Sequence, residues 1–127
     1  MASQAEISYT NVFVGGPLLS RRHITDENGT DLTAADVASV TLNVYRLALN
    51  SAGRQERIAV TGWEDIALTV GDVLFPTITA SNGKKRNFSY CVEGAFTLPD
   101  TSYLVEYRIV TTSGHTIIIL IQATTRI

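Results

Sequence analysis

Few side chains in this sequence could do chemistry, and their spacing matches no familiar catalytic or metal site. The two histidines, His23 and His115, have no second histidine at ligand spacing, so a zinc site would have to combine them with Cys91 and carboxylates. A serine nucleophile in a G-x-S-x-G turn is absent. We therefore predict that the protein is not an enzyme and binds no metal and no cofactor.

Carboxylates offer a second route to chemistry. Acid pairs occur at Asp26-Glu27 and Glu64-Asp65, but hydrolysis by paired carboxylates requires two acids that face one cleft. The segment 26–31 superficially resembles a calcium loop, yet its glycine comes too early and Val37 stands where an EF-hand requires glutamate. Asn-Gly is a favoured turn pair, so we interpret this segment as a hairpin.

The bulk composition narrows the range of partners. The net charge of −2 supplies no field that would attract nucleic acid, and the one basic run, 84–86, reads as a solvated turn. The longest apolar run, 117–121, is far too short for a membrane span. Residues 1–6 do not resemble a secretory leader. We expect synthesis in a cytoplasm, with no nucleic acid and no membrane as partners.

Any functional side chain must be positioned by strands, because period-two alternation dominates the chain. It is clearest in 40–47 and 103–110, and weaker extended segments occur at 9–14, 19–25, 54–61, 72–80 and 86–93. One helical turn is expected at 34–38, where Thr33 and Asp36 have capping-box spacing. The turn signals between short strands predict one all-β domain of the sandwich type.

The last predicted strand, 116–121, is apolar on both faces. At the edge of a sheet such a strand would promote aggregation. We therefore expect it either to lie inside a sheet or to be covered by another chain. The low charged fraction of 17%, against about 25% in an average soluble domain, also suits a surface covered by neighbours.

Several motifs occur in a suggestive order from residue 20 onward. The D-x-x-G segment 26–29 precedes a short helix and a strand; Asn87-Phe88-Ser89 and a Phe-Thr-Leu-Pro corner at 96–99 follow; a Y-x-V-x-Y strand at 103–107, a Ser-Gly hairpin and an apolar last strand complete the chain. This order resembles small immunoglobulin-like virion proteins of tailed bacteriophages. The resemblance implies an immunoglobulin-like β-sandwich of about 7–9 strands with at most one short helix, over residues 20–127.

The resemblance also implies a function. It points to a structural subunit of a phage particle, in the capsid decoration, neck, tail or baseplate. The protein would be located in the virion. It would form a trimer or hexamer of identical chains and would also bind other virion proteins. Residues 1–19 lie outside the match, and we expect them to form an extended arm that reaches a neighbouring subunit. The predicted interface residues are Tyr9, Val12, Trp63, Ile117, Ile119 and Ile121, although Trp63 suits a core position equally well.

Two other functions remain open at this point. A carbohydrate- or ligand-binding module, such as a receptor-binding piece, would use Tyr9, Trp63 or Tyr90 to line a groove. A small β-barrel enzyme would place His23 or His115 beside a carboxylate in a deep pocket. An assembly subunit would form oligomers, whereas a binding module would act as a monomer through one exposed aromatic cluster.

Overall fold

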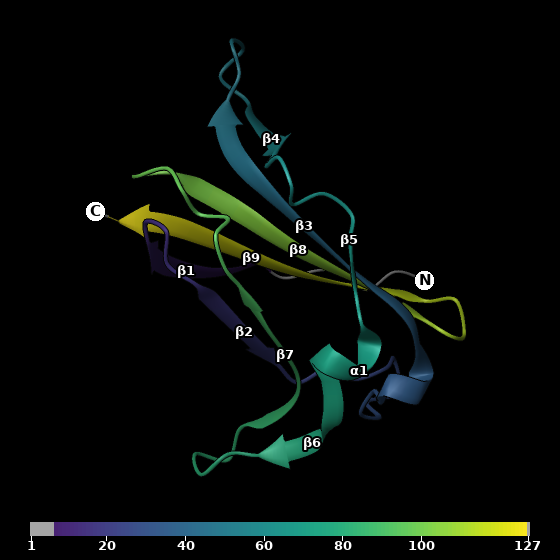
Figure 1. Cartoon of the computed structure of the whole chain (residues 1–127). Coiled ribbons are helices and arrows are strands. Elements are labelled where there is room, and N and C mark those ends of the chain that lie inside the picture. The colour runs from purple at the N-terminus through teal and green to yellow at the C-terminus, as the bar shows by residue number, and fades with distance from the viewer. Residues whose placement is uncertain (1–6, 127) are drawn as a thin grey trace.

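A computed structural model describes residues 7–126 and shows two β-sheets that face each other (Figure 1). The prediction of an all-β sandwich is confirmed. The elements in chain order are β1 (Ile7–Phe13), β2 (Leu18–Arg22), a 3-10 turn (Ala34–Asp36), β3 (Val37–Leu49), β4 (Gln55–Ala59), β5 (Ile66–Leu68), α1 (Val70–Val73), β6 (Leu74–Thr79), β7 (Lys85–Val92), β8 (Ser102–Thr111) and β9 (Thr116–Arg126).

The larger sheet has the strand order β1-β9-β8-β3-β4, with β5 pairing beside β4 on the same side of β3. All of its ladders are antiparallel except the one between β1 and β9, which is parallel. The smaller sheet has the order β2-β7-β6. This strand order is immunoglobulin-like. One sheet contains β2, β7 and β6, and the other places β9, β8 and β3 side by side.

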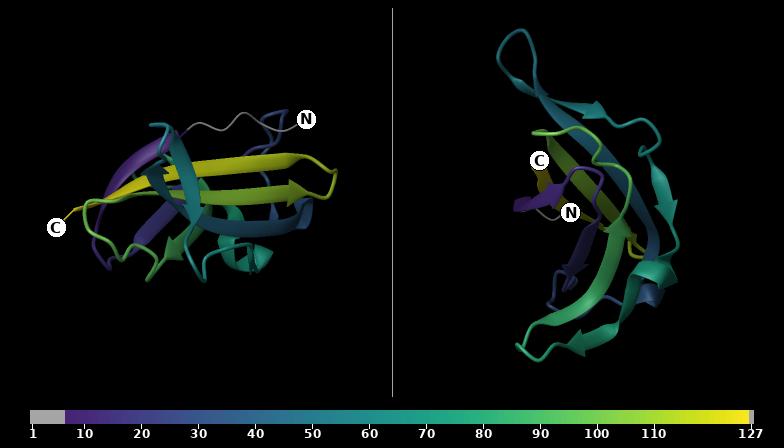
Figure 2. Two further views of the ribbon diagram at one scale, coloured as in Figure 1. Left: turned by 90° about the horizontal axis from the view of Figure 1, so that it is seen from above. Right: turned by 60° about the vertical axis from the view of Figure 1, so that its left-hand side comes forward.

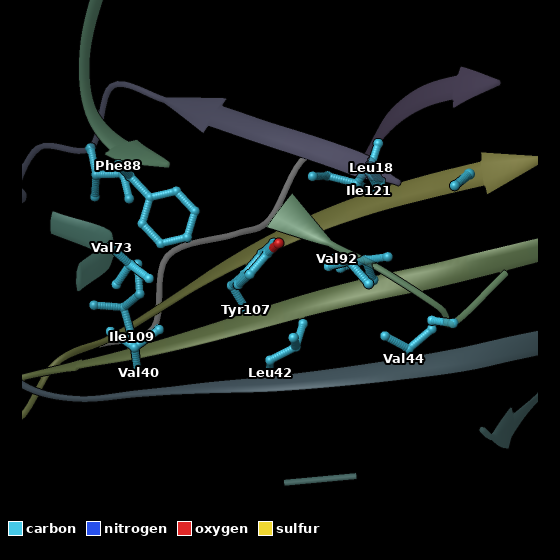
Figure 3. Close-up of a cluster of buried hydrophobic side chains, with 14 of the residues drawn as sticks. Leu18, Val40, Leu42, Val44, Val73, Phe88, Val92, Tyr107, Ile109 and Ile121 are labelled. Carbon is cyan, nitrogen blue, oxygen red and sulfur yellow. The ribbon is translucent and has the colours of Figure 1, made fainter. Parts of the chain in front are cut away.

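The core forms where the two inner faces meet (Figure 3). Val40, Leu42 and Val44 alternate along β3 and are fully or almost fully buried, as the sequence pattern predicts. Phe88 of β7 packs edge-on against Tyr107 of β8, with ring centroids 5.0 Å apart. Edge-to-face aromatic pairs add to the stabilisation that burial of their apolar area supplies, so these two rings fasten the sheets together.

A tyrosine fixes the crossing from the smaller sheet to the larger one. Tyr103 stands at the start of β8, and its phenolic oxygen accepts a hydrogen bond from the backbone N–H of Leu98, at 3.0 Å. Its ring packs edge-on against Phe96, with centroids 5.2 Å apart. This arrangement is the tyrosine corner typical of immunoglobulin-like sandwiches, and it explains the aromatic residues around Pro99.

The helical segments are as short as the sequence suggests. The 3-10 turn Ala34–Asp36 begins after Thr33, and the Asp36 carboxylate accepts hydrogen bonds from the backbone and hydroxyl of Thr33. This is the predicted capping box. The four-residue α1 was not expected. Pro76 lies in β6, at an edge of the smaller sheet, where its missing N–H breaks no central ladder.

The β3–β4 hairpin extends beyond the rest of the sandwich (Figures 1 and 2). The last residue of β3 that pairs with β8 is Arg46, after which Leu47 to Leu49 pair with β4 alone. A two-stranded ribbon of this kind is only marginally stable by itself. The tip is closed by Asn50, whose side-chain oxygen accepts hydrogen bonds from the backbones of Ala52 and Arg54.

The N-terminal segment corrects one prediction. Residues 1–19 were expected to form an extended arm, but β1 is an integral strand of the larger sheet, paired along its full length with β9, and Leu18 begins β2 in the core. Alternation over so few residues did not reveal a partner strand at the other end of the chain. Residues 1–6 of the predicted arm lie outside the described part.

Candidate functional site

Strand β1 exposes the largest concentration of apolar surface in the described chain. Tyr9 is 71% exposed, Phe13 79% and Ile7 41%, and Val14 directly after the strand is also exposed. These four account for half of the eight large hydrophobic residues that are exposed between residues 7 and 126. A contiguous exposed apolar patch marks a surface that binds a partner more often than a scattered one does.

The direction of the side chains follows from the alternation along β1. Val12 is buried in the core, so Ser8 and Thr10 share its inward side, while Ile7, Tyr9 and Phe13 point to the outer face of the larger sheet. On that face Ile7 lies beside Leu120 and Tyr9 beside Gln122 of β9. Leu120 is buried and Gln122 is polar, so the exposed apolar side chains of this patch all come from β1 and Val14.

The strand β9 lies between β1 and β8. Of the two explanations for its apolar faces, the interior position is the one found, so the sequence Ile117–Ile121 no longer argues for an oligomer. Ile121 is buried in the core, and Ile117 and Ile119 are half-buried against it. A charged residue at Ile119 would therefore disturb folding and would not test assembly.

The six predicted interface residues differ in exposure and do not form one surface. Tyr9 is exposed on the sheet edge, as an interface residue must be. Val12 and Ile121 lie in the core and are not available to a partner, which corrects that part of the prediction. Trp63 is half-buried against the core, and its backbone exchanges hydrogen bonds with Val44 and Val60. Ile7 and Phe13, which the prediction omitted, belong to the exposed patch.

The centre of the same outer face is closed by the protein's own side chains. The Glu106 carboxylate is only 6% exposed and lies 3.7 Å from both Arg57 and Arg108. The Arg57 guanidinium also lies over the Tyr45 ring, 5.7 Å from its centroid. Because these charged and aromatic groups cover the middle strands, the exposed large apolar side chains of the larger sheet lie away from its centre, in β1 and at Leu49 of the β3–β4 hairpin.

A pocket of about 440 Å³ opens at one end of the sandwich, between the 26–31 hairpin and the β8–β9 turn. Leu32 and Ile117 supply its apolar lining, while Glu27, Ser113 and His115 supply polar groups. The His115 Nε2 atom lies 3.4 Å from the Glu27 carboxylate. A pocket of this size suits a small ligand.

The acids around this pocket have local structural roles. The Asp26 side-chain oxygen accepts hydrogen bonds from the backbone N–H groups of Asn28 and Thr30, and Asp36 caps the 3-10 turn. Gly29 adopts a positive φ of 80°, as the Asn-Gly turn requires. The interpretation of 26–31 as a hairpin turn is therefore confirmed, and its acid cluster is explained by the turn.

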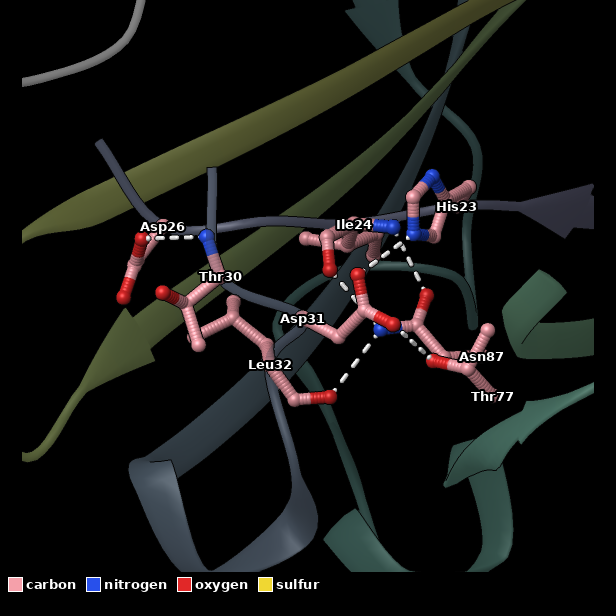
Figure 4. A network of polar contacts seen from close by, with 8 residues as sticks. All are labelled: His23, Ile24, Asp26, Thr30, Asp31, Leu32, Thr77 and Asn87. Carbon is pink, nitrogen blue, oxygen red and sulfur yellow. Dashed lines mark hydrogen bonds and ion pairs between the residues drawn. The ribbon is translucent and has the colours of Figure 1, made fainter. Parts of the chain in front are cut away.

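A second polar cluster joins the hairpin to β6 (Figure 4). The Asp31 carboxylate accepts a hydrogen bond of 2.6 Å from the Thr77 hydroxyl and lies 2.7 Å from the His23 Nε2 atom. The Thr77 hydrogen bond, followed by the contact with His23, lowers the pKa of Asp31. Both oxygens of this carboxylate are engaged, so the cluster ties the hairpin to the smaller sheet.

Asn87 fixes both ends of this hairpin through hydrogen bonds to its backbone. The sequence did not predict this role of Asn87. Its amide nitrogen donates to the carbonyl oxygens of Ile24 and Leu32, at 2.7 and 3.0 Å, and its oxygen accepts from the Ile24 N–H at 2.7 Å. The side chain is fully buried. The partners of Asn87 lie more than fifty residues away in the chain. A single polar residue within a strand does not reveal such partners from the sequence.

The residues considered for a composite zinc site are engaged separately. His23 contacts Asp31, His115 contacts Glu27, and the Cys91 thiol donates a long hydrogen bond to Glu93. Burial, followed by the nearby Glu93 charge, raises the pKa of Cys91, which favours the protonated thiol. Between residues 7 and 126 no group of three or more potential metal ligands is assembled. In the same range no helix is long and apolar enough to cross a bilayer.

The aromatic groove of the alternative binding module is not assembled. Tyr9 lies on one edge strand of the larger sheet, whereas Trp63 follows β4 at the opposite edge. The Tyr90 ring packs edge-on against Tyr107, at 6.2 Å between centroids. Comparison with known protein families, curated protein sequences and solved structures gave no significant match. The functional conclusion therefore depends on the surface of the chain itself.

Proposed function

We propose that this chain is a structural subunit that assembles with copies of itself and with other proteins, and that its setting is a phage particle. The observation that carries the proposal is the exposed apolar surface of β1, formed by Ile7, Tyr9 and Phe13. An exposed patch of this kind at a sheet edge costs solubility unless a partner covers it. The phage setting comes from the order of motifs in the sequence.

A second candidate function is favoured by the end pocket. Its volume of about 440 Å³ and its combination of hydroxyl, carboxylate and apolar groups suit a small polar ligand. Among the described residues that line it there is no Phe, Tyr or Trp, the side chains on which a sugar ring usually stacks. We therefore place assembly before ligand binding.

Size-exclusion chromatography with light scattering, followed by negative-stain imaging of any oligomer, tests the first proposal. We expect a trimer or hexamer for the unaltered chain. Removing the apolar groups in Tyr9→Ser/Phe13→Ser should lower the mass of the oligomer, because both side chains are exposed and their loss leaves the core intact. The matched control is Leu49→Ser/Ile78→Ser, which removes two exposed apolar side chains from other strands.

The results separate the two candidates. An unaltered chain that stays monomeric at tens of micromolar contradicts self-assembly. An oligomer whose mass is the same in both double variants contradicts the assignment of the contact to β1. Saturable binding of a small polar ligand by a monomer, lost in a Ser113→Trp variant that fills the end pocket, would favour the binding module.

A further inference from the structure

The four edges of the two sheets differ in their protection against pairing. Strand β4 carries Glu56 and Arg57, β5 on the same edge has only three residues, β2 ends in Arg21 and Arg22, and β6 contains Pro76. Charged residues, proline and very short strands are devices with which proteins prevent an edge from adding another strand. Strand β1 has the sequence Ile-Ser-Tyr-Thr-Asn-Val-Phe, with no charge and no proline.

The space beside β1 is also open. Within residues 7–126, β1 pairs with β9 on one side and with no strand on the other. A groove of about 230 Å³ runs between β1 and β2, lined by Ser8, Thr10, Leu18 and Leu19, with Arg22 as the only charged residue in its lining. A strand that added to β1 would lie along this groove without displacing a described element.

We propose that the partner of this edge is β1 of a second copy, paired antiparallel about a two-fold axis at Thr10. This inference deepens the proposed function and rests on it. Two identical strands related by a two-fold axis across a sheet edge are necessarily antiparallel, and each supplies the same surface. Thr10 is the middle residue of the seven in β1, so a pairing centred there uses the whole strand.

This register matches the faces of the strand. It places Ile7 opposite Phe13 of the second copy and Tyr9 opposite its Asn11 on the outer face, with Thr10 opposite Thr10 on the inner face. Cross-strand pairs of apolar residues and of threonines stabilise antiparallel sheets. No like charges meet, because the strand has none. The exposed apolar side chains of both copies then form one continuous outer surface.

A second copy explains the edge better than a foreign strand does. One two-fold contact covers the unprotected edges of both chains at once, whereas a foreign strand would still leave its own outer edge unpaired. Of the two oligomers expected above, the contact fits a hexamer that contains two-fold axes. It is incompatible with a trimer of purely cyclic symmetry, in which no two-fold axis exists.

Disulfide trapping tests the register directly. In a Cys91→Ser background, Thr10→Cys places the only two thiols of a dimer opposite each other, at the spacing of directly paired residues. We expect a covalent dimer after mild oxidation. The matched control is Leu49→Cys, which is 73% exposed on the β3–β4 hairpin and should stay monomeric on denaturing gels.

A charge pair provides a second, independent readout. Tyr9→Lys places a strongly hydrated charge on the edge, and we expect the dissociation constant of the contact to rise about tenfold, since two symmetry-related pairs are weakened. Adding Asn11→Glu to Tyr9→Lys creates two opposite-charge pairs across the axis and should restore association. Both positions point to solvent, so circular dichroism should show unaltered folding.

The outcomes distinguish this inference from the function on which it rests. A stable oligomer that shows no trapping at Thr10→Cys and no response to Tyr9→Lys overturns the pairing and leaves assembly through another surface. A monomer under all conditions overturns both. Trapping in both Thr10→Cys and Leu49→Cys would indicate random collision and would also overturn the proposed register. Trapping at Thr10→Cys alone, with rescue by the charge pair, supports it.

Discussion

The backbone N–H of Leu98 donates a hydrogen bond of 3.0 Å to the phenolic oxygen of Tyr103, and this bond closes the corner where the chain crosses between the sheets. Tyr103 is almost fully buried, so bulk water does not compete with its hydroxyl for the Leu98 N–H. The bond links the segment before Pro99 to the first tyrosine of β8, and so fixes how the chain passes from one sheet to the other. The first prediction follows from it.

Replacing Tyr103 by phenylalanine should lower the free energy of unfolding by about 1–3 kcal/mol, because the Leu98 N–H loses its acceptor in a partly buried site. Urea denaturation measures the change. Tyr90→Phe is the control: the Tyr90 hydroxyl makes no hydrogen bond within the described part of the chain, and its substitution should cost little. Equal losses in the two variants would show that the corner bond does not stabilise the fold.

Asn87 should be among the most sensitive polar positions. Asn87→Leu leaves two carbonyl oxygens and one N–H of Ile24 and Leu32 without their partner, and we expect a loss of about 3–5 kcal/mol. The comparison is Asn82→Ala, which removes the exposed side-chain oxygen that accepts a hydrogen bond from the Lys84 backbone N–H and should cost about 1 kcal/mol or less. A small loss in Asn87→Leu would mean that water or a rearranged hairpin satisfies these groups.

Alkaline pH should destabilise the protein through Tyr107. Burial raises the pKa of Tyr107 from 10.0 to about 12, so the unfolded chain releases this proton at a lower pH than the folded chain does. The associated stability is complete below pH 10 and is lost as the pH rises towards 12, by about 3 kcal/mol in total. Denaturation at several pH values checks this.

In the variant Tyr107→Phe, most of this loss of stability at alkaline pH should be absent. Tyr45 and Cys91, whose pKa values are also raised by burial, contribute to the remaining pH dependence. The hydrogen bond from Tyr107 to Ser20 is long, at 3.3 Å, so the variant should remain folded at neutral pH. An unchanged alkaline limb in Tyr107→Phe would assign the transition to other groups.

Asp31 should respond to the loss of Thr77. The Thr77 hydroxyl is the main cause of the lowered pKa of Asp31, so Thr77→Val should move that pKa up towards the ordinary value of 3.8. Because the folded-state pKa is lowered, its contribution to stability is present above the ordinary value and is lost as pH falls through the folded-state value. The variant should therefore show a weaker acid dependence.

An NMR titration of the Asp31 carboxyl carbon measures this shift, and Thr79→Val, a substitution on the exposed end of β6, serves as the control. The contact between Asp31 and His23 remains in both variants. An Asp31 pKa that is equal in Thr77→Val and in the unaltered chain would rule out the hydroxyl as its cause.

The sequence predicts this fold well where neighbours along the strand decide it. Alternation in Val40–Val44 and in Tyr103–Ile109 places the right side chains in the core, and the Asn-Gly and capping-box signals give the right turns. Parallel pairing of β1 with β9 depends on two segments at opposite ends of the chain. The local sequence pattern cannot reveal such a contact, so the sequence predicts an extended arm over residues 1–19 where the structure has β1.

The candidate site was predicted only in part, for a related reason. Tyr9 is exposed as expected, whereas Val12 and Ile121 were assigned to an interface because apolar residues serve cores and contacts equally well. The distinction depends on which face of each strand meets the second sheet. The role of Asn87 and the contact of Glu106 with Arg57 of β4 likewise depend on segments that lie far apart in the sequence.

Hydrogen exchange at increasing protein concentration tests most directly the claim that the edge of β1 is covered in the assembled protein. We predict that amides within Ile7–Phe13 exchange more slowly as concentration rises, while those of the protected edges β4 and β6 keep constant rates. Exchange in β1 that does not depend on concentration, in a sample that light scattering shows to be oligomeric, would contradict the account.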